Sequence, residues 1–314
     1  MRILLAFALA LPPSVPARDD PVPPPAGSGV QVTSTLTNEM AIRFTAAGKL
    51  LRAVQQSTVE RSAAVIEVVN ELGAGLDGEE AAKIASGDLK FEAPRTKPPY
   101  VRVRYGKCVA TVEHGESTEY ETPESDGRYF LERSAPSGAG AGAQPEVRLL
   151  YANQGSVPRE DVAKRVAIDA DAFVAGPRLA PLVLGKELAA DAVLDVPPAL
   201  LAPLLAQAVP DGTVTKATLR RAGPGDGCVG RDAFKISVVI AWKGGEELPV
   251  SATFDLAGDL VVMRDTGQVS GLTLSGPIQY SGSSNENGAQ LEIAGTGKLT
   301  LDYRAEPLPK QDGK

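Results

Sequence analysis

Strict alternation of apolar and polar side chains dominates the C-terminal half of the chain. A period of two places the apolar side chains on one face of a β-strand. Short polar connections with Gly, Asp or Asn, such as Gly258-Asp259, predict turns between further strands at 260–264, 269–274, 278–280, 291–293 and 299–303. A meandering antiparallel sheet is the simplest topology for this pattern. The alternation is clearest in two stretches: Phe234, Ile236, Val238, Ile240 and Trp242, then Leu248, Val250, Ala252, Phe254 and Leu256.

The N-terminal half carries the same signal less evenly. Strands are predicted at 32–44, 100–113, 128–133 and 145–151. Segment 46–72 leaves two alternatives open: its Leu, Ala and Gln content favours a helix, whereas its run of β-branched Val and Ile side chains favours a strand. Helices are predicted at 79–85 and at 197–208, where Pro197-Pro198 precedes a stretch rich in Leu and Ala.

These elements predict a mainly β fold with two antiparallel, meander-rich sheet lobes and one or two helices. We expect an N-terminal β-rich lobe over 31–196 and a helix plus C-terminal antiparallel lobe over 197–306. Residues 307–314 are expected to form a flexible tail.

The first residues indicate export. Met1-Arg2 is a short basic region, 3–11 is apolar, and Val15 and Ala17 are the small residues that a signal peptidase selects. We therefore expect a signal peptide over 1–17, cleaved after Ala17, and a periplasmic or extracellular protein. A disordered Pro/Gly linker is expected over 18–30. The apolar run is shorter than the roughly 20 residues that span a bilayer, and no later stretch predicts a membrane span.

Two cysteines, Cys108 and Cys228, allow one intramolecular disulfide in an oxidising compartment. We predict this bridge, with two unpaired thiols as the open alternative. A bridge that closes so long a loop would stabilise the fold by on the order of 4–5 kcal/mol in the chain-entropy model.

The region around the second predicted helix carries a resemblance. Gly185-Lys186, Leu188, Val196-Pro197, the Ala/Leu-rich helix and then Phe254-Asp255-Leu256 occur in this order. Over 100–303 the chain resembles a family of secreted bacterial proteins that has no assigned activity. The resemblance implies a β-rich extracytoplasmic fold in two lobes. The resemblance implies no catalytic or binding activity. The chain departs from the family pattern at Asp191-Ala192 and Leu194.

The charge balance disfavours nucleic acid as a partner. The formal net charge is −7, so the chain as a whole would not attract phosphate backbones. Arg102, Arg104 and Lys107 are the local exception. They alternate with apolar residues, which indicates a solvated strand face, with a patch for an anionic ligand as the second interpretation.

Catalytic and metal-binding residues are scarce. The chain has one histidine, His114, which excludes a zinc site with several imidazoles and leaves no evident partner for a catalytic triad. The segment 225–230 matches the Gly-x-Gly-x-x-Gly pattern but lies between predicted strands, so we expect no nucleotide cofactor. Two groups of acids could bind calcium or serve a glycosidase, but the simpler interpretation is solvated loop charge: Asp169 and Asp171, and Glu119, Glu121, Glu124 and Asp126.

We therefore predict a non-catalytic protein with no metal, no cofactor and no catalytic residues. The leading hypothesis is an exported binding protein that holds an apolar ligand on a curved sheet, through residues of 234–240 with Leu248, Val250 and Phe254. Trp242 and these same residues could instead fill a core. The alternatives are a scaffold or surface-associated interaction protein that binds a protein partner through a sheet edge, and, third, a hydrolase.

Overall fold

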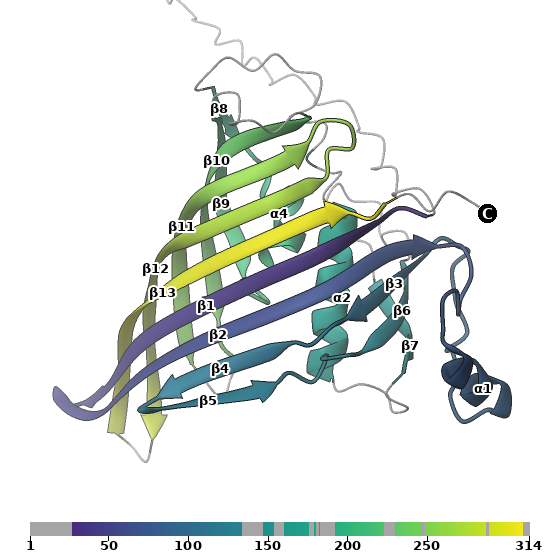
Figure 1. Cartoon of the computed structure of the whole chain (residues 1–314). Helices are drawn as coiled ribbons and strands as arrows, with labels where there is room; N and C mark the ends of the chain where they lie inside the picture. The colour runs from purple at the N-terminus through teal and green to yellow at the C-terminus, as the bar shows by residue number, and fades with distance from the viewer. Residues whose placement is uncertain are drawn as a thin grey trace, which may run out of the picture.

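The computed structural model describes residues 27–133, 147–153, 160–175, 179, 182, 192–222, 230–245, 249–286 and 289–309. Figure 1 shows a large sheet with a few helices against it. The helices and strands of the described residues are α1 (Gly78–Ser86), α2 (Glu160–Ala175) and α4 (Pro198–Leu205), and β1 (Gly29–Ala46), β2 (Lys49–Val69), β3 (Tyr100–Tyr105), β4 (Val109–His114), β5 (Glu116–Glu121), β6 (Arg128–Arg133), β7 (Val147–Ala152), β8 (Val193–Asp195), β9 (Thr213–Arg221), β10 (Arg231–Lys243), β11 (Val250–Met263), β12 (Val269–Glu286) and β13 (Ala289–Pro307).

All of these strands belong to one antiparallel sheet. Its order is β7-β6-β3-β2-β1-β13-β12-β11-β10-β9-β8, and the β4–β5 hairpin joins it through the pairing of β4 with β2. The sheet is open, with β7 and β8 at its two ends. The predicted mainly β, antiparallel fold is confirmed. Strands of both predicted lobes lie in this single sheet because β1 pairs with β13 from Val30 to Ala46.

Segment 46–72, for which the sequence allowed either a helix or a strand, contains the strand β2. It forms a hairpin with β1 through the two-residue turn Ala47-Gly48, whose φ values of 47° and 73° are those of a type I′ turn. Its β-branched residues Ile66 and Val68 are buried. The β-branched content was therefore the informative signal. β1 begins at Gly29, within the linker predicted over 18–30.

The C-terminal strands are longer than the sequence predicts. Gly258-Asp259, predicted as a turn, lies inside β11, where Gly258 is opposite Leu274 on β12. β12 joins the two strands predicted at 269–274 and 278–280, and β13 joins those predicted at 291–293 and 299–303. The turns predicted within β11, β12 and β13 were therefore wrong, because the glycines at those places occupy strand positions.

Three glycines inside the C-terminal strands permit close approach between neighbouring backbones. A Cβ atom would lie 1.8 Å from the Thr273 carbonyl oxygen at Gly258, 1.9 Å from that of Asp255 at Gly276, and 2.3 Å from that of Glu39 at Gly297. Glycine inside a strand marks a bend or a close backbone approach. The glycines therefore allow the sheet to curl, which gives it a concave face.

The predicted helices are present, and one further helix was missed. α1 and α4 confirm the helices expected at 79–85 and 197–208. α1 begins with a capping box between Asp77 and Glu80. α2 was not predicted, although Val162, Val166 and Phe173 recur at helical spacing and are buried. No helix in the described part of the chain is long and apolar enough to cross a bilayer.

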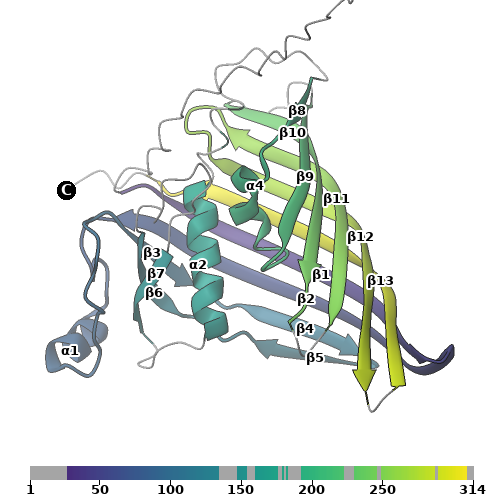
Figure 2. The same cartoon turned by 180° about the vertical axis from the view of Figure 1, so that it is seen from behind.

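The core lies between the concave face and two of the helices. Figure 2 shows α2 and α4 on the concave side, with the ends of β1, β2, β12 and β13 extending away from them. α2 contacts β3 and β7, and α4 contacts β9. The helices contribute buried apolar side chains to a core shared with most strands: Val162, Val166, Ala170 and Phe173 from α2, and Leu201, Leu204 and Leu205 from α4.

Candidate functional site

Apolar side chains recur on the concave face beyond the part that the helices cover, after a polar stretch with Ser34 and Asn38 on β1 and Glu60, Thr58 and Gln56 on β2. On β1, Val30 and Val32 lie in the core. Met40, Ile42 and Phe44 follow at the same two-residue period, and pairing with β13 continues through them without a register shift. Alternate residues of a strand share one face. These three side chains therefore extend the concave face toward the β1–β2 turn, where they are half-buried.

Neighbouring strands continue this surface in register. We call the apolar surface formed by Met40, Ile42, Phe44, Val54 and Tyr280, together with the buried Ile293 beside Phe44, the concave extension. The row through Phe44 crosses β2, β1, β13, β12 and β11 at Arg52, Phe44, Ile293, Gly282 and Val250. The row through Ile42 crosses six strands, at Val54, Ile42, Gly295, Tyr280, Ala252 and Trp242.

The side chains of the concave extension are mainly apolar. Its one ionisable side chain is Tyr280, and burial raises the pKa of that hydroxyl above its usual value, so the group stays neutral. Arg52 lies exposed at the rim. Aliphatic, thioether and aromatic side chains offer apolar contact and no nucleophile or general base.

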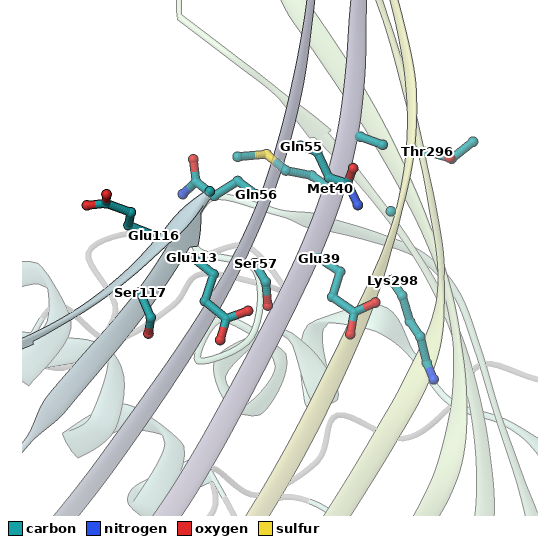
Figure 3. A pocket seen from close by; sticks show the side chains of 13 residues that line it. Glu39, Met40, Gln55, Gln56, Ser57, Glu113, Glu116, Ser117, Thr296 and Lys298 are labelled. Carbon is teal, nitrogen blue, oxygen red and sulfur yellow. The ribbon is translucent and has the colours of Figure 1, made fainter.

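A polar hollow occupies the opposite face of some of the same strands. It has a volume of about 740 Å³ and lies where β1, β2, β13 and the β4–β5 hairpin meet. Figure 3 shows Glu39, Ser57, Glu113 and Lys298 projecting from neighbouring strands into it. Glu39 and Lys298 are register partners. Across the described residues, no group of three His, Cys, Asp or Glu side chains could hold a metal ion. The hollow is therefore a mainly polar surface, which Met40 also lines.

A buried polar cluster surrounds Asp169 on α2. Its carboxylate accepts hydrogen bonds from the Tyr105 hydroxyl at 2.6 Å and the Gln207 amide at 3.0 Å, and Arg165 Nε lies 3.4 Å away. Burial, and then the Asp169 carboxylate, raise the pKa of Tyr105 well above its usual value, so the hydroxyl stays a donor. Because the carboxylate is buried and occupied by these partners, the cluster fastens α2 to β3 and to the segment after α4.

Asp169 and Asp171 were interpreted as solvated loop charge, and this is wrong for Asp169, which is buried. Both lie in the helix α2. Asp169 belongs to the buried cluster, and Asp171 lies 3.8 Å from Arg133. The other predicted acids do not converge: Glu119 and Glu121 are exposed on β5, and Glu124 and Asp126 follow in the turn before β6. These positions support the simpler interpretation of solvated charge.

The predicted basic face is largely paired within the fold. Arg102 and Arg104 share the carboxylate of Glu67, at 2.8 and 3.1 Å, and Lys107 lies 3.5 Å from Glu121. Arg104 and Lys107 are exposed, as expected of a solvated face, whereas the side chain of Arg102 is largely buried.

The predicted disulfide is not tested by the described residues. Cys108 is a buried thiol, and its burial raises its pKa above the usual value. Cys228 lies outside the described residues, as does most of the 225–230 glycine motif. The bridge between Cys108 and Cys228 stays a prediction.

The strand residues first expected to line a ligand site lie in the core instead. Phe234, Ile236, Val238, Ile240, Val250 and Phe254 are buried, and Leu248 lies outside the described residues. α4 packs on β9 next to these strands. Trp242 is partly buried against the same core. The sequence offered one signal for the concave extension, the period-two alternation of Met40, Ile42 and Phe44.

His114 lies exposed at the end of β4, directly before the turn at Gly115. Its Nδ1 atom is 2.9 Å from the Gln55 carbonyl oxygen.

We expect His114→Ala to change the free energy of unfolding by less than about 0.5 kcal/mol, since the ring is exposed and makes one solvent-accessible hydrogen bond. Thermal unfolding measures the stability change, and binding of a fluorescent apolar probe measures whether ligand binding is kept. Loss of a general base typically lowers the rate of a reaction 10²- to 10⁴-fold. A His114→Ala variant that kept its melting temperature but lost an activity of the wild type would therefore support the hydrolase hypothesis.

No family model matches the chain, and no curated protein matches it. A solved structure of lipovitellin, described as showing lipid–protein interactions, aligns with 92% of this chain and 27% of its own chain, at 9% identity and a TM-score of 0.34. A putative modulator of a DNA gyrase from Thermotoga maritima aligns with 88% of this chain and 96% of its own, at 11% identity and a TM-score of 0.11. At such scores neither likeness carries an argument. The resemblance to secreted bacterial proteins stays a prediction.

Proposed function

We propose that this protein is an exported, non-catalytic binding protein that holds an apolar ligand on the concave extension. The observation that carries the proposal is the group of half-buried apolar side chains on the concave face past the helices. The accessible part of the row through Ile42 crosses four strands, since Ala252 is buried and Trp242 packs against the core. Strands lie about 4.8 Å apart, so this part extends roughly 14 Å.

The energetic argument rests on side chains that the fold leaves half-buried. Met40, Ile42 and Phe44 retain part of their apolar surface in contact with solvent. Each Å² that a ligand removed from water would contribute about 25 cal/mol. The neutral hydroxyl of Tyr280 is the polar group on this surface that could orient one end of the ligand.

A pair of neighbouring substitutions on β1 tests this function. Ile42→Asp places a carboxylate on the concave extension, whereas Ala41→Asp places one on the exposed opposite face of the same strand. We expect Ile42→Asp to weaken binding of a fluorescent fatty acid at least tenfold, because charge on an apolar surface must be desolvated by the ligand. Ala41→Asp should bind as the wild type does.

The melting temperature of each variant separates lost binding from lost folding. Met40→Gln gives a milder test, since it conserves side-chain volume and adds polarity. The proposal is wrong if the wild type binds no apolar probe, or if Ile42→Asp and Met40→Gln bind it as tightly as the wild type. Native mass spectrometry of the purified protein adds a check, because a co-purifying ligand appears as extra mass.

The scaffold alternative requires an accessible strand edge. β5 is such an edge, since its recorded pairing is with β4 alone. Its residues Glu116, Glu119 and Glu121 are exposed. Charged side chains on an edge strand oppose the addition of another strand. β5 is therefore a poor edge for docking, whereas β8, at one end of the sheet, carries the exposed apolar Val193 and is the edge on which the scaffold alternative rests.

A further inference from the structure

The β1–β2 hairpin ends in an exposed apolar tip. We call residues 43–52 the hairpin tip. Leu50 and Leu51 lie within it and are 61% and 63% exposed. Among the described residues, the other large hydrophobic side chains with comparable exposure are Tyr120 and Val193, which lie on β5 and β8. Two adjacent exposed leucines therefore set this tip apart from the rest of the surface.

The fold holds the two leucines in a protruding position. The type I′ turn at Ala47-Gly48 fixes the end of the hairpin. Thr45 pairs with Leu50 and Phe44 with Arg52, so Leu51 is the extra residue of a bulge. A bulge changes the direction of the side chains around it. Figure 1 shows the tip extending beyond the ends of β4 and β5, and β4 pairs with β2 over Ser57 to Arg61.

The hairpin tip is cationic in an acidic protein. Arg43, Lys49 and Arg52 are exposed, and no Asp or Glu occurs between Glu39 and Glu60. One acid lies in register with the tip, Glu292, which is opposite Thr45 on β13. The net charge of the tip with this acid is therefore positive, whereas that of the whole chain is −7.

We infer that the hairpin tip docks on a lipid bilayer that contains anionic lipids. Leu50 and Leu51 insert at the boundary of headgroups and acyl chains, and Arg43, Lys49 and Arg52 contact headgroup phosphates. An exposed apolar group flanked by cations is the combination that holds proteins at an anionic bilayer surface. The acidic remainder of the chain is repelled by the same surface, which orients the tip toward it. This docking does not depend on the proposed ligand.

Flotation of the purified protein with vesicles tests the docking. Vesicles of phosphatidylcholine with 30% phosphatidylglycerol should bind the wild type, and vesicles of phosphatidylcholine alone should bind it much more weakly. The double variant Leu50→Asn/Leu51→Asn should lose at least tenfold in binding to the anionic vesicles. Lys49→Glu/Arg52→Glu should lose at least 25-fold at low salt, since each cation contributes roughly fivefold.

Two matched controls place the effect at the tip. Val193→Asn replaces an exposed apolar residue on β8, and Lys216→Glu reverses an exposed charge on β9. Both should leave vesicle binding within twofold of the wild type, and all variants should keep the wild-type melting temperature because these side chains are exposed. The inference is overturned if the wild type does not float with anionic vesicles, if both tip variants bind as the wild type does, or if the controls lose as much binding as the tip variants. Because ligand binding is measured with a soluble probe, loss of docking alone leaves the proposed function standing.

Discussion

Replacing Gly276 with alanine should lower the free energy of unfolding by more than about 4 kcal/mol. The new Cβ would lie 1.9 Å from the Asp255 carbonyl oxygen and 2.9 Å from the carbonyl carbon. Both atoms belong to the backbone of β11, so no side-chain rotation relieves the clash. The strands would have to separate at the point where the sheet bends, and the pairing of β11 with β12 would weaken. Urea denaturation followed by circular dichroism measures the change.

A second glycine in the same strand serves as the control. At Gly271 the nearest atom to a new Cβ is 3.7 Å away, which is ordinary contact. Gly271→Ala should therefore change stability by less than about 1 kcal/mol, and a small gain is allowed because alanine has fewer unfolded conformations. Equal denaturation midpoints for Gly276→Ala and Gly271→Ala would show that the curl of the sheet does not depend on glycine.

Replacing Asp169 with alanine should cost about 3–5 kcal/mol of stability. The substitution leaves the Tyr105 hydroxyl and the Gln207 amide without their acceptor, and it removes the carboxylate beside Arg165. Arg165 stays charged when Asp169 is lost because a guanidinium does not deprotonate in proteins, and Glu60, at 3.9 Å, remains as its other carboxylate partner. A buried donor without an acceptor and a largely buried charge that loses its nearer counterion are both expensive.

Two variants on α2 make the Asp169 result specific. Asp169→Asn keeps an acceptor oxygen and loses the charge, so it should cost less than Asp169→Ala. Lys164 also lies on α2 and forms an exposed ion pair with Asp211, which is outside the helix. Lys164→Ala removes this pair and should cost less than about 1 kcal/mol of stability. Thermal or urea unfolding ranks the three variants. If Asp169→Ala were no less stable than Lys164→Ala, the buried cluster would not fasten α2 to the sheet.

The sequence predicts individual strands well where one face is buried. In β10, Phe234 and Ile236 alternate with Lys235 and Ser237, and the two apolar side chains lie in the core. The turn predicted at Gly258 was wrong because glycine is common both in turns and at bends within strands, and local sequence does not distinguish the two. The helix α2 was not predicted, although Val162 and Val166 have helical spacing.

The candidate site was less predictable than the strands for a physical reason. Whether an apolar strand face is covered depends on where the helices pack, and this is a property of the whole fold. β10 and β1 both show period-two alternation, yet Ile240 is buried in the core while Ile42 remains half-exposed. The pairing of β1 with β13 could not be predicted either, since it joins residues about 245 to 277 positions apart.

That pairing has a consequence for the order of folding. β1 and β13 are neighbours in the middle of the sheet, and Leu308 donates a backbone hydrogen bond to Gly29 at 2.9 Å. During synthesis β1 exposes an unpaired edge until the last strand has been made, so completion of the sheet is a late event with a high loop-closure cost. The same adjacency places Gly29 and Leu308 side by side. A short peptide could join these two positions, and the chain could then be opened at another surface turn with the strand order preserved.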